Sequence, residues 1–155
     1  MEYSALLFGK NESIDLFLED KDCLQIVQCL NADEMKDLKP EKKVMFVRMS
    51  DKLYVALLMG LKAVSQENVL VIKEKMEVTL LQKIKKELSE YPAIYYNENI
   101  QAFDTRLVML CLQVAIESNF AIDSYSKAVE ILGSTPLKKI YNSHKFNKNL
   151  SILFT

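Results

Sequence analysis

Few side chains in this sequence are typical of a catalytic centre, and the single histidine is the first to consider. A Ser-His-Asp or Cys-His device would have to use His144, which stands beside Lys145 in a polar stretch that we expect to be exposed. The three cysteines are Cys23, Cys29 and Cys111, and buried thiols are usually inert. Their spacing, even with His144, does not match that of zinc ligands. We therefore predict no catalytic residue of this kind and no metal site.

Phosphate-binding loops and paired carboxylates are the next chemistry to consider. The glycines Gly9, Gly60 and Gly133 are isolated, so the sequence has no glycine-rich phosphate loop. Acidic pairs occur at 19–20 and 33–34, where helix-start charge or a solvated surface explains them. Nothing singles out one pair as a general acid and base. We expect no cofactor, and we predict that the protein is not an enzyme.

The C-terminal segment 138–148 combines basic and aromatic side chains. Such a combination can hold phosphates and stack bases, although a basic helix end is the simpler interpretation. The residues concerned are Lys138, Lys139, Tyr141, His144, Lys145, Phe146 and Lys148.

Three tyrosines surround a proline earlier in the chain. Tyr91, Tyr95 and Tyr96 lie beside Pro92, and tyrosine is enriched at protein interfaces. The cluster is either an exposed recognition patch or part of the core, and the sequence leaves both alternatives open.

The element expected to position these residues is the apolar run Leu107–Ile116, in which only Gln113 is polar. It is too short to cross a bilayer, which takes about 20 helical residues. A helix that is apolar all round must be buried among other helices. A second such run, Leu53–Val64, is interrupted only by Gly60 and Lys62. We predict an all-α, compact multi-helix domain around this pair.

Other segments fit this prediction less evenly. Apolar residues recur at helical spacing through Met76–Leu88, and Glu2–Phe8 is interpreted as a short helix that ends at Gly9. Val44–Met49 and Val69–Ile72 are rich in β-branched residues and also suit strands. We assign the first of these two to a helix.

A weak internal similarity occurs at an offset of 51 residues. Residues 61–63 align with 112–114, and residues 68–71 align with 119–122. This pattern loosely resembles helical-repeat arrays of the HEAT and armadillo kind, whose units run about 40–47 residues. The alternative is that any two antiparallel helices share it.

Length, charge and cysteine content set the broader expectations. The 155 residues fit a single domain, residues 1–155, or a fragment of a longer protein. An odd number of cysteines without a secretory signal predicts an intracellular protein, cytoplasmic or nuclear, with no membrane association. The net charge is −1, but residues 1–40 are acidic and residues 131–155 are basic, which favours partner binding or self-association.

These observations lead to a functional hypothesis. We predict a non-enzymatic scaffold or adaptor that binds a partner peptide or helix in an apolar groove. The first alternative is a nucleic-acid-binding module that uses segment 138–148, and the second is an enzyme or ligand carrier with an apolar pocket between helices. The predicted partner-binding residues are Tyr91, Tyr95, Tyr96, Lys138, Lys139, Tyr141, Lys145 and Phe146.

Overall fold

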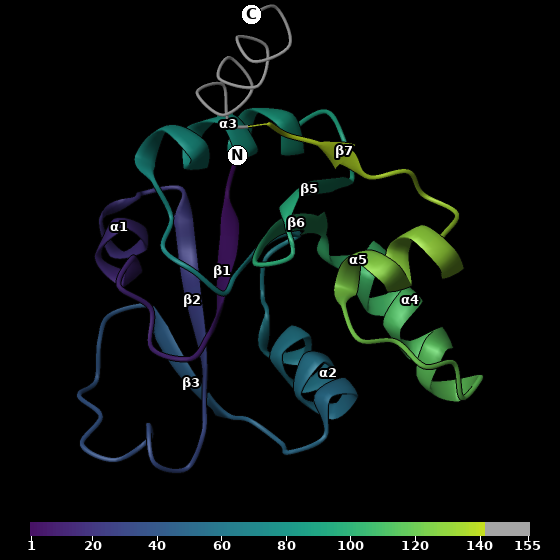
Figure 1. The fold of residues 1–155 in the computed structure, drawn as a ribbon. Helices are drawn as coiled ribbons and strands as arrows, with labels where there is room; N and C mark the ends of the chain where they lie inside the picture. Colours follow the sequence, from purple (N-terminus) through teal and green to yellow (C-terminus); the bar gives the residue numbers. More distant parts are fainter. Residues whose placement is uncertain (142–155) are drawn as a thin grey trace, which may run out of the picture.

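The computed structural model describes residues 1–141, which form an α/β fold around one sheet (Figure 1). The strands of this part of the chain are β1 (Tyr3–Phe8), β2 (Cys23–Leu30), β3 (Val44–Arg48), β4 (Asn68–Ile72), β5 (Ala93–Asn97), β6 (Ile100–Asp104) and β7 (Lys138–Lys139). Its helices are α1 (Ile14–Glu19), α2 (Leu53–Ala63), α3 (Val78–Leu88), α4 (Thr105–Glu117), α5 (Tyr125–Lys127) and the π-helical η1 (Ala128–Leu132). The prediction of an all-α domain is therefore wrong.

The strand order within the sheet is β3-β2-β1-β4-β6-β5-β7. Strands β3, β2, β1 and β4 are parallel, whereas β6 runs antiparallel to both of its neighbours, β4 and β5. Each pair of successive parallel strands is connected through a crossover segment, as this arrangement requires. The carboxyl ends of the four parallel strands therefore lie along one edge of the sheet.

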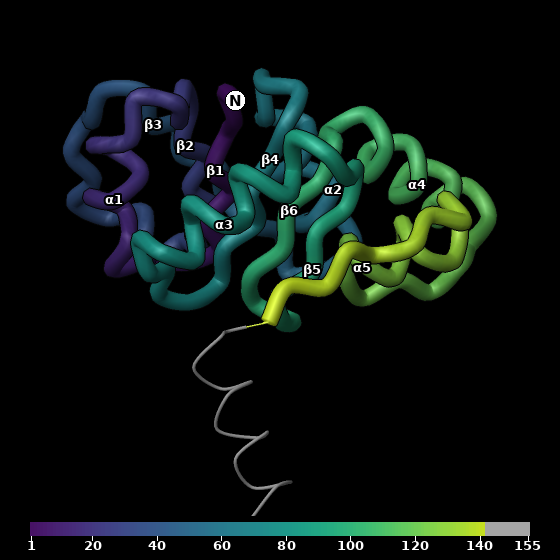
Figure 2. The backbone as a smooth tube through the Cα atoms, turned by 90° about the horizontal axis from the view of Figure 1, so that it is seen from above, coloured from purple at the N-terminus to yellow at the C-terminus, as the bar shows by residue number. Residues whose placement is uncertain are grey.

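Helices cover both faces of the sheet. Helices α1 and α3 lie on one face and α2 and α4 on the other (Figure 2). One core layer packs Phe17, Leu81 and Ile84 against one face of the sheet, and the second packs Leu57, Leu112 and Tyr125 against the other. Strands covered on both faces are apolar on both sides, which removes the alternation that marks a half-exposed strand.

This loss of alternation explains the main error of the sequence analysis. Glu2–Phe8 and Val44–Met49 were interpreted as helical, but they contain β1 and β3. A buried parallel strand and a buried helix segment look alike in a short apolar run. The ambiguous run Val69–Ile72 belongs to β4.

The predicted helical repeat is also wrong. Residues 61–63 and 112–114 do lie in helices, α2 and α4. The aligned second halves differ, because residues 68–71 form strand β4 and residues 119–122 form an irregular connection. The helices α2, α3 and α4 themselves were correctly located. Within residues 1–141, no helix is long and apolar enough to span a bilayer.

Helix α4 is not buried on all sides as its sequence suggested. Leu112 is fully buried, whereas Leu110 is 61% exposed and Val114 is also exposed. The helix lies on a sheet, which covers one side of it, so an apolar residue on the opposite side meets solvent.

We expect Leu112→Ala to lower the free energy of unfolding by about 2–5 kcal/mol, because it leaves a cavity in the core. Leu110→Ala is the matched control on the same helix and should stay within about 0.5 kcal/mol of wild type. Urea denaturation of both variants checks this, and equal effects would contradict the packing of α4.

An ion cluster joins α3 to the amino ends of β1 and β2. Lys85 Nζ lies 3.1 Å from Asp20 Oδ2 and 2.7 Å from Asp22 Oδ2, and Tyr3 Oη donates to Asp20 at 2.8 Å. Burial alone would raise the pKa of Asp20, but the hydrogen bonds from Tyr3, the Asp22 amide and Lys85 outweigh it and hold that pKa below its ordinary value. The hydrogen bond from Lys85 also lowers the pKa of Asp22.

The cluster makes stability depend on pH in the acid range. Carboxylates with lowered pKa values stabilise the fold above their ordinary pKa of about 3.9 and lose that contribution as the pH falls through the lowered values. We expect Lys85→Met to lower the midpoint of urea denaturation at pH 7. The free energy of unfolding of this variant should also fall less steeply below pH ~4 than that of wild type. The exposed neighbour provides the control, Lys86→Met, which should keep the wild-type profile.

Candidate functional site at the carboxyl edge of the sheet

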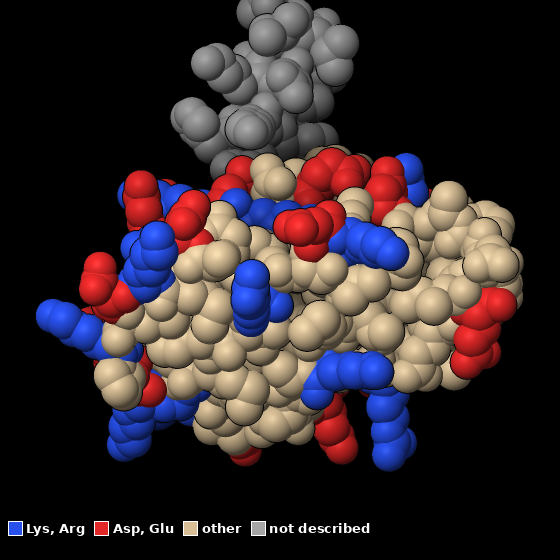
Figure 3. All heavy atoms as spheres, turned by 90° about the horizontal axis from the view of Figure 1, so that it is seen from below, with Lys and Arg blue, Asp and Glu red and all other residues tan. Residues whose placement is uncertain are grey.

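The strand order creates a topological switch point between β1 and β4. From β1 the chain adds β2 and β3 on one side and then returns to place β4 on the other side. The connections that leave β1 and β4 lead to α1 and α3 and lie side by side, because Asn11 donates to the Glu74 carbonyl and the Met76 amide donates to Ser13 Oγ. Ligands of open α/β sheets bind at such a switch point, outside the carboxyl ends of the strands. Figure 3 views this edge of the molecule, where basic side chains stand among the uncharged residues of the centre and most acidic side chains lie toward the margins.

Lys73 directly follows β4 at this switch point. Its ammonium group lies 5.5 Å from the centre of the Phe8 ring and makes no hydrogen bond or ion pair with any residue in 1–141. Partial burial lowers the pKa of Lys73, and the carboxylates of Glu98 and Asp123 oppose that shift. The Lys73 side chain is exposed to solvent, so the switch point carries an accessible cation that has no direct anionic partner within residues 1–141.

Asparagine side chains fix the segment that carries Lys73. Asn97 and Asn99 donate to the two carboxylate oxygens of Glu74 at 2.8 and 3.2 Å, and Asn11 donates to the Glu74 carbonyl at 3.0 Å. The Lys73 amide donates to the Asn99 carbonyl at 2.7 Å. These bonds join the loops after β1, β4 and β5. The fold itself therefore fixes the backbone position of Lys73, without a ligand.

The loop after β1 begins with a strained backbone position. Gly9 has a φ of +80°, which a side chain would disfavour, and its amide donates to the Cys29 carbonyl at 2.8 Å. The next amide, of Lys10, donates to Glu34 Oε2 at 3.2 Å. The turn leaves the Lys10 side chain exposed one residue beyond the end of β1.

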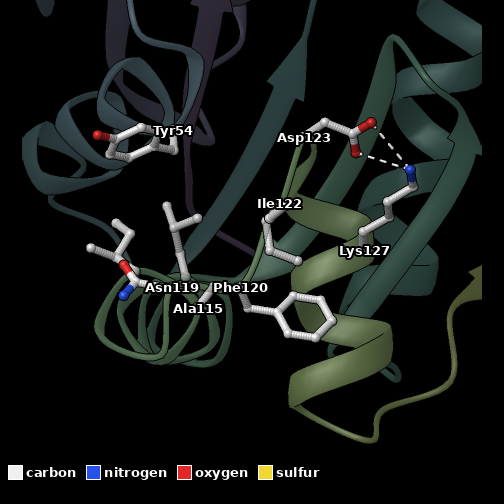
Figure 4. Close-up of a pocket in the computed structure, with 10 residues that line it drawn as sticks. Tyr54, Ala115, Asn119, Phe120, Ile122, Asp123 and Lys127 are labelled. Atoms are coloured by element: carbon white, nitrogen blue, oxygen red, sulfur yellow. Dashed lines mark hydrogen bonds and ion pairs between the residues drawn. The ribbon is translucent and has the colours of Figure 1, made fainter.

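A pocket of about 550 Å³ opens at the same edge, on the face covered by α2 and α4 (Figure 4). Its apolar part comes from α4 and the connection to α5. Its polar groups are the Tyr54 hydroxyl, the Asn119 amide and the ion pair between Asp123 and Lys127. The lining residues are Tyr54, Leu112, Ala115, Ile116, Asn119, Phe120, Ala121, Ile122, Asp123 and Lys127.

The pocket adjoins the switch point. The charge of Asp123, in the pocket wall, acts on Lys73. The ring of Phe8, which faces Lys73, packs against Tyr125 with ring centres 6.3 Å apart, and Tyr125 donates its hydroxyl hydrogen to the Leu57 carbonyl of α2. We call the loops 9–13 and 73–77 together with the pocket the carboxyl-edge site.

The structure brings together two groups of residues that the sequence analysis treated separately. Lys138 and Lys139 form β7, not the expected helix, and pair with Ile94 and Tyr95 of β5. Lys138 Nζ lies 4.9 Å from the centre of the Tyr91 ring. The tyrosine cluster and the start of the basic segment therefore share the far edge of the sheet.

The remaining predicted partner-binding residues divide into two sets. Tyr96 and Tyr141 line a smaller pocket of about 190 Å³, and Tyr141 also accepts a hydrogen bond from Lys83 at its carbonyl. Lys145 and Phe146 lie outside the described residues. Partner binding by these residues stays a prediction.

Sequence reasoning missed Lys73, Asn119 and the pocket. Lys73 follows an apolar run that was left ambiguous, and only the strand order shows that it stands at a switch point. Among residues 1–141, no group of three or more His, Cys, Asp or Glu side chains is arranged to hold a metal ion.

Comparisons with known proteins give a consistent fold. The sequence matches no protein-family model and no curated protein. Among solved structures, 4-diphosphocytidyl-2C-methyl-D-erythritol synthase of Anaerococcus prevotii is similar over 90% of this chain and 87% of that chain, with 16% identity and a TM-score of 0.72. The 2-C-methyl-D-erythritol 4-phosphate cytidylyltransferase of Thermus thermophilus matches over 92% and 89%, with 14% identity and a TM-score of 0.66. That of Francisella tularensis matches over 90% of both chains, with 6% identity and a TM-score of 0.67.

These similarities establish the fold and correct the functional hypothesis. The predicted function, a non-enzymatic scaffold or else a nucleic-acid-binding module, is contradicted because structures of enzymes share this fold along most of the chain. The hypothesis also assumed a groove between helices of an all-α domain, whereas the helices of residues 1–141 pack on a sheet.

The electrostatic link between the pocket and Lys73 can be measured. Asp123 raises the pKa of Lys73, so we expect Asp123→Asn to lower that pKa, as followed by NMR titration of the lysine ε-carbon. Asp15→Asn, on the exposed surface of α1, is the control and should leave the titration unchanged. An unchanged Lys73 titration in Asp123→Asn would show that the pocket and the switch point are electrically separate.

Proposed function

We propose that this chain is a nucleotidyltransferase that binds a nucleoside triphosphate, CTP in the first instance, at the carboxyl-edge site. The observation that carries the proposal is the ammonium group of Lys73 at the switch point, which is exposed, faces the Phe8 ring and makes no ion pair within residues 1–141. The similar structures from Thermus thermophilus and Francisella tularensis are cytidylyltransferases, and this likeness supports the choice of nucleotide.

The chemistry matches what Lys73 offers. In nucleotidyl transfer an acceptor oxygen attacks the α-phosphorus, a new P–O bond forms, and the bond to the bridging oxygen breaks as pyrophosphate leaves with the electron pair. Negative charge develops on the phosphoryl oxygens, and a fixed cation in a partly desolvated site stabilises it. Lys73 would supply that cation, and Lys10, beyond the neighbouring strand, would contact the outer phosphates.

The hydrogen bonds from the asparagine side chains to Glu74 position the neighbouring Lys73 for this function. They fix the loop that presents Lys73 before the ligand binds, so little conformational entropy is lost on binding. The carboxylate of Glu74 accepts hydrogen bonds from two amides and is thereby directed away from a role as a general base.

We also propose an intracellular location. Cys23, Cys29 and Cys111 are buried free thiols, a state typical of a reducing compartment.

Titration with magnesium CTP, followed by calorimetry, tests the binding step. We expect Lys73→Met to weaken CTP binding roughly 10- to 100-fold, the range for losing a hydrogen bond to a charged group. Lys86→Met, on the exposed surface of α3 and outside the carboxyl-edge site, should bind CTP like wild type.

Release of pyrophosphate from CTP in the presence of 2-C-methyl-D-erythritol 4-phosphate, or of other small alcohols and phosphate esters, tests the transfer step. Wild-type protein that binds no nucleoside triphosphate would overturn the proposal. Binding without pyrophosphate release across the acceptor set would reduce it to nucleotide binding alone.

A further inference from the structure

The pocket beside Lys73 is unsuited to a phosphate. Its one cation, among the described lining residues, is Lys127, whose ammonium group lies 3.1 Å from Asp123 Oδ1. The carboxyl end of α4 borders the pocket, and the carbonyl groups of a helix end carry partial negative charge. An uncharged part of a ligand is therefore favoured there, and the apolar surface of Leu112 and Ile122 adds to that preference.

One polar side chain in the pocket is available to such a ligand. The amide of Asn119 makes no hydrogen bond with any residue in 1–141 and is exposed, on a backbone with a φ of +52°. An amide offers a donor and an acceptor side by side, which pair with the complementary edge of a nucleobase. Tyr54, 43% exposed, lies across the pocket from Asn119 in Figure 4 and offers an aromatic ring for stacking.

We propose that this pocket takes the nucleoside of the triphosphate whose phosphates lie at Lys73, with the base between Tyr54 and the amide of Asn119. The inference rests on the proposed function and names the part of the site that recognises the base. Its volume of about 550 Å³ falls in the range of small-molecule sites. The Phe8 ring connects the two parts of the site, because its centre lies 5.5 Å from Lys73 Nζ and 6.3 Å from the ring centre of Tyr125, which comes two residues after Asp123 of the pocket wall.

The test separates the uncharged and charged halves of the ligand. Cytidine, tripolyphosphate and CTP are titrated into wild type and variants, with amide NMR shifts as the readout. Asn119→Gly keeps the positive φ and removes only the amide side chain, and Tyr54→Leu removes the ring from an exposed position. Gln113→Ala, exposed on α4 and outside the pocket, is the control.

We expect Asn119→Gly and Tyr54→Leu each to weaken cytidine and CTP binding about 3- to 10-fold, the range for one neutral hydrogen bond or one stacking contact. Tripolyphosphate binding should be unchanged in both. Lys73→Met should show the reverse, with loss of tripolyphosphate binding and unchanged cytidine binding, and Gln113→Ala should match wild type throughout.

The outcomes separate the two proposals. If CTP and tripolyphosphate bind but neither pocket variant affects cytidine or CTP, the base lies elsewhere and this inference is overturned, while the proposed function stands. If cytidine binds through Asn119 but CTP and tripolyphosphate do not bind, the pocket is a nucleoside site and the proposed function fails.

Discussion

The pairing of β1 on both of its sides is the constraint from which the rest of the structure follows. Residues 4–7 of β1 pair in parallel with residues 25–28 of β2 and with residues 69–72 of β4. Parallel neighbours cannot be joined by tight turns, so crossover helices must cover both faces. The same pairing puts the ends of β1 and β4 side by side, and hydrogen bonds of Asn11 and Ser13 join the loops that leave them. The juxtaposition of Gly9 and Lys73 is thus a geometric consequence of strand order.

Two lysines show how this framework separates structural charge from available charge. Lys85 lies at the amino edge of the sheet with two carboxylates at hydrogen-bonding distance, so its charge is neutralised within the fold. Lys73 lies at the carboxyl edge, partly desolvated, with only the Phe8 ring and more distant carboxylates around it. The first lysine contributes to the fold through its ion pairs, whereas no carboxylate within residues 1–141 pairs with the second. This contrast is the reason the proposal places the ligand at the carboxyl edge.

The three longest predicted helices were located correctly as α2, α3 and α4, whereas the shorter segments 2–8 and 44–49 form strands. Polar residues occupy one face of α3, and its helical spacing is unmistakable. Gly60 looked like an interruption of α2, but a Cβ there would lie 3.2 Å from both Cys29 Sγ and a methyl group of Leu6. The glycine allows α2 to lie close to β1 and β2, which positions Tyr54 at the edge of the pocket. No pattern within the helix itself indicates this role.

The sequence alone determined which segments are apolar and where α2, α3 and α4 lie. It could not decide whether short apolar runs become strands or helices, because burial on both faces removes the alternation that distinguishes them. Nor could it join Asn11, Lys73, Asn97 and Asp123, which are far apart along the chain and meet only when the order of the strands is set. The tertiary structure decided the site, because the hydrogen bonds between strands set which strands are adjacent, and spacing along the sequence does not specify that order.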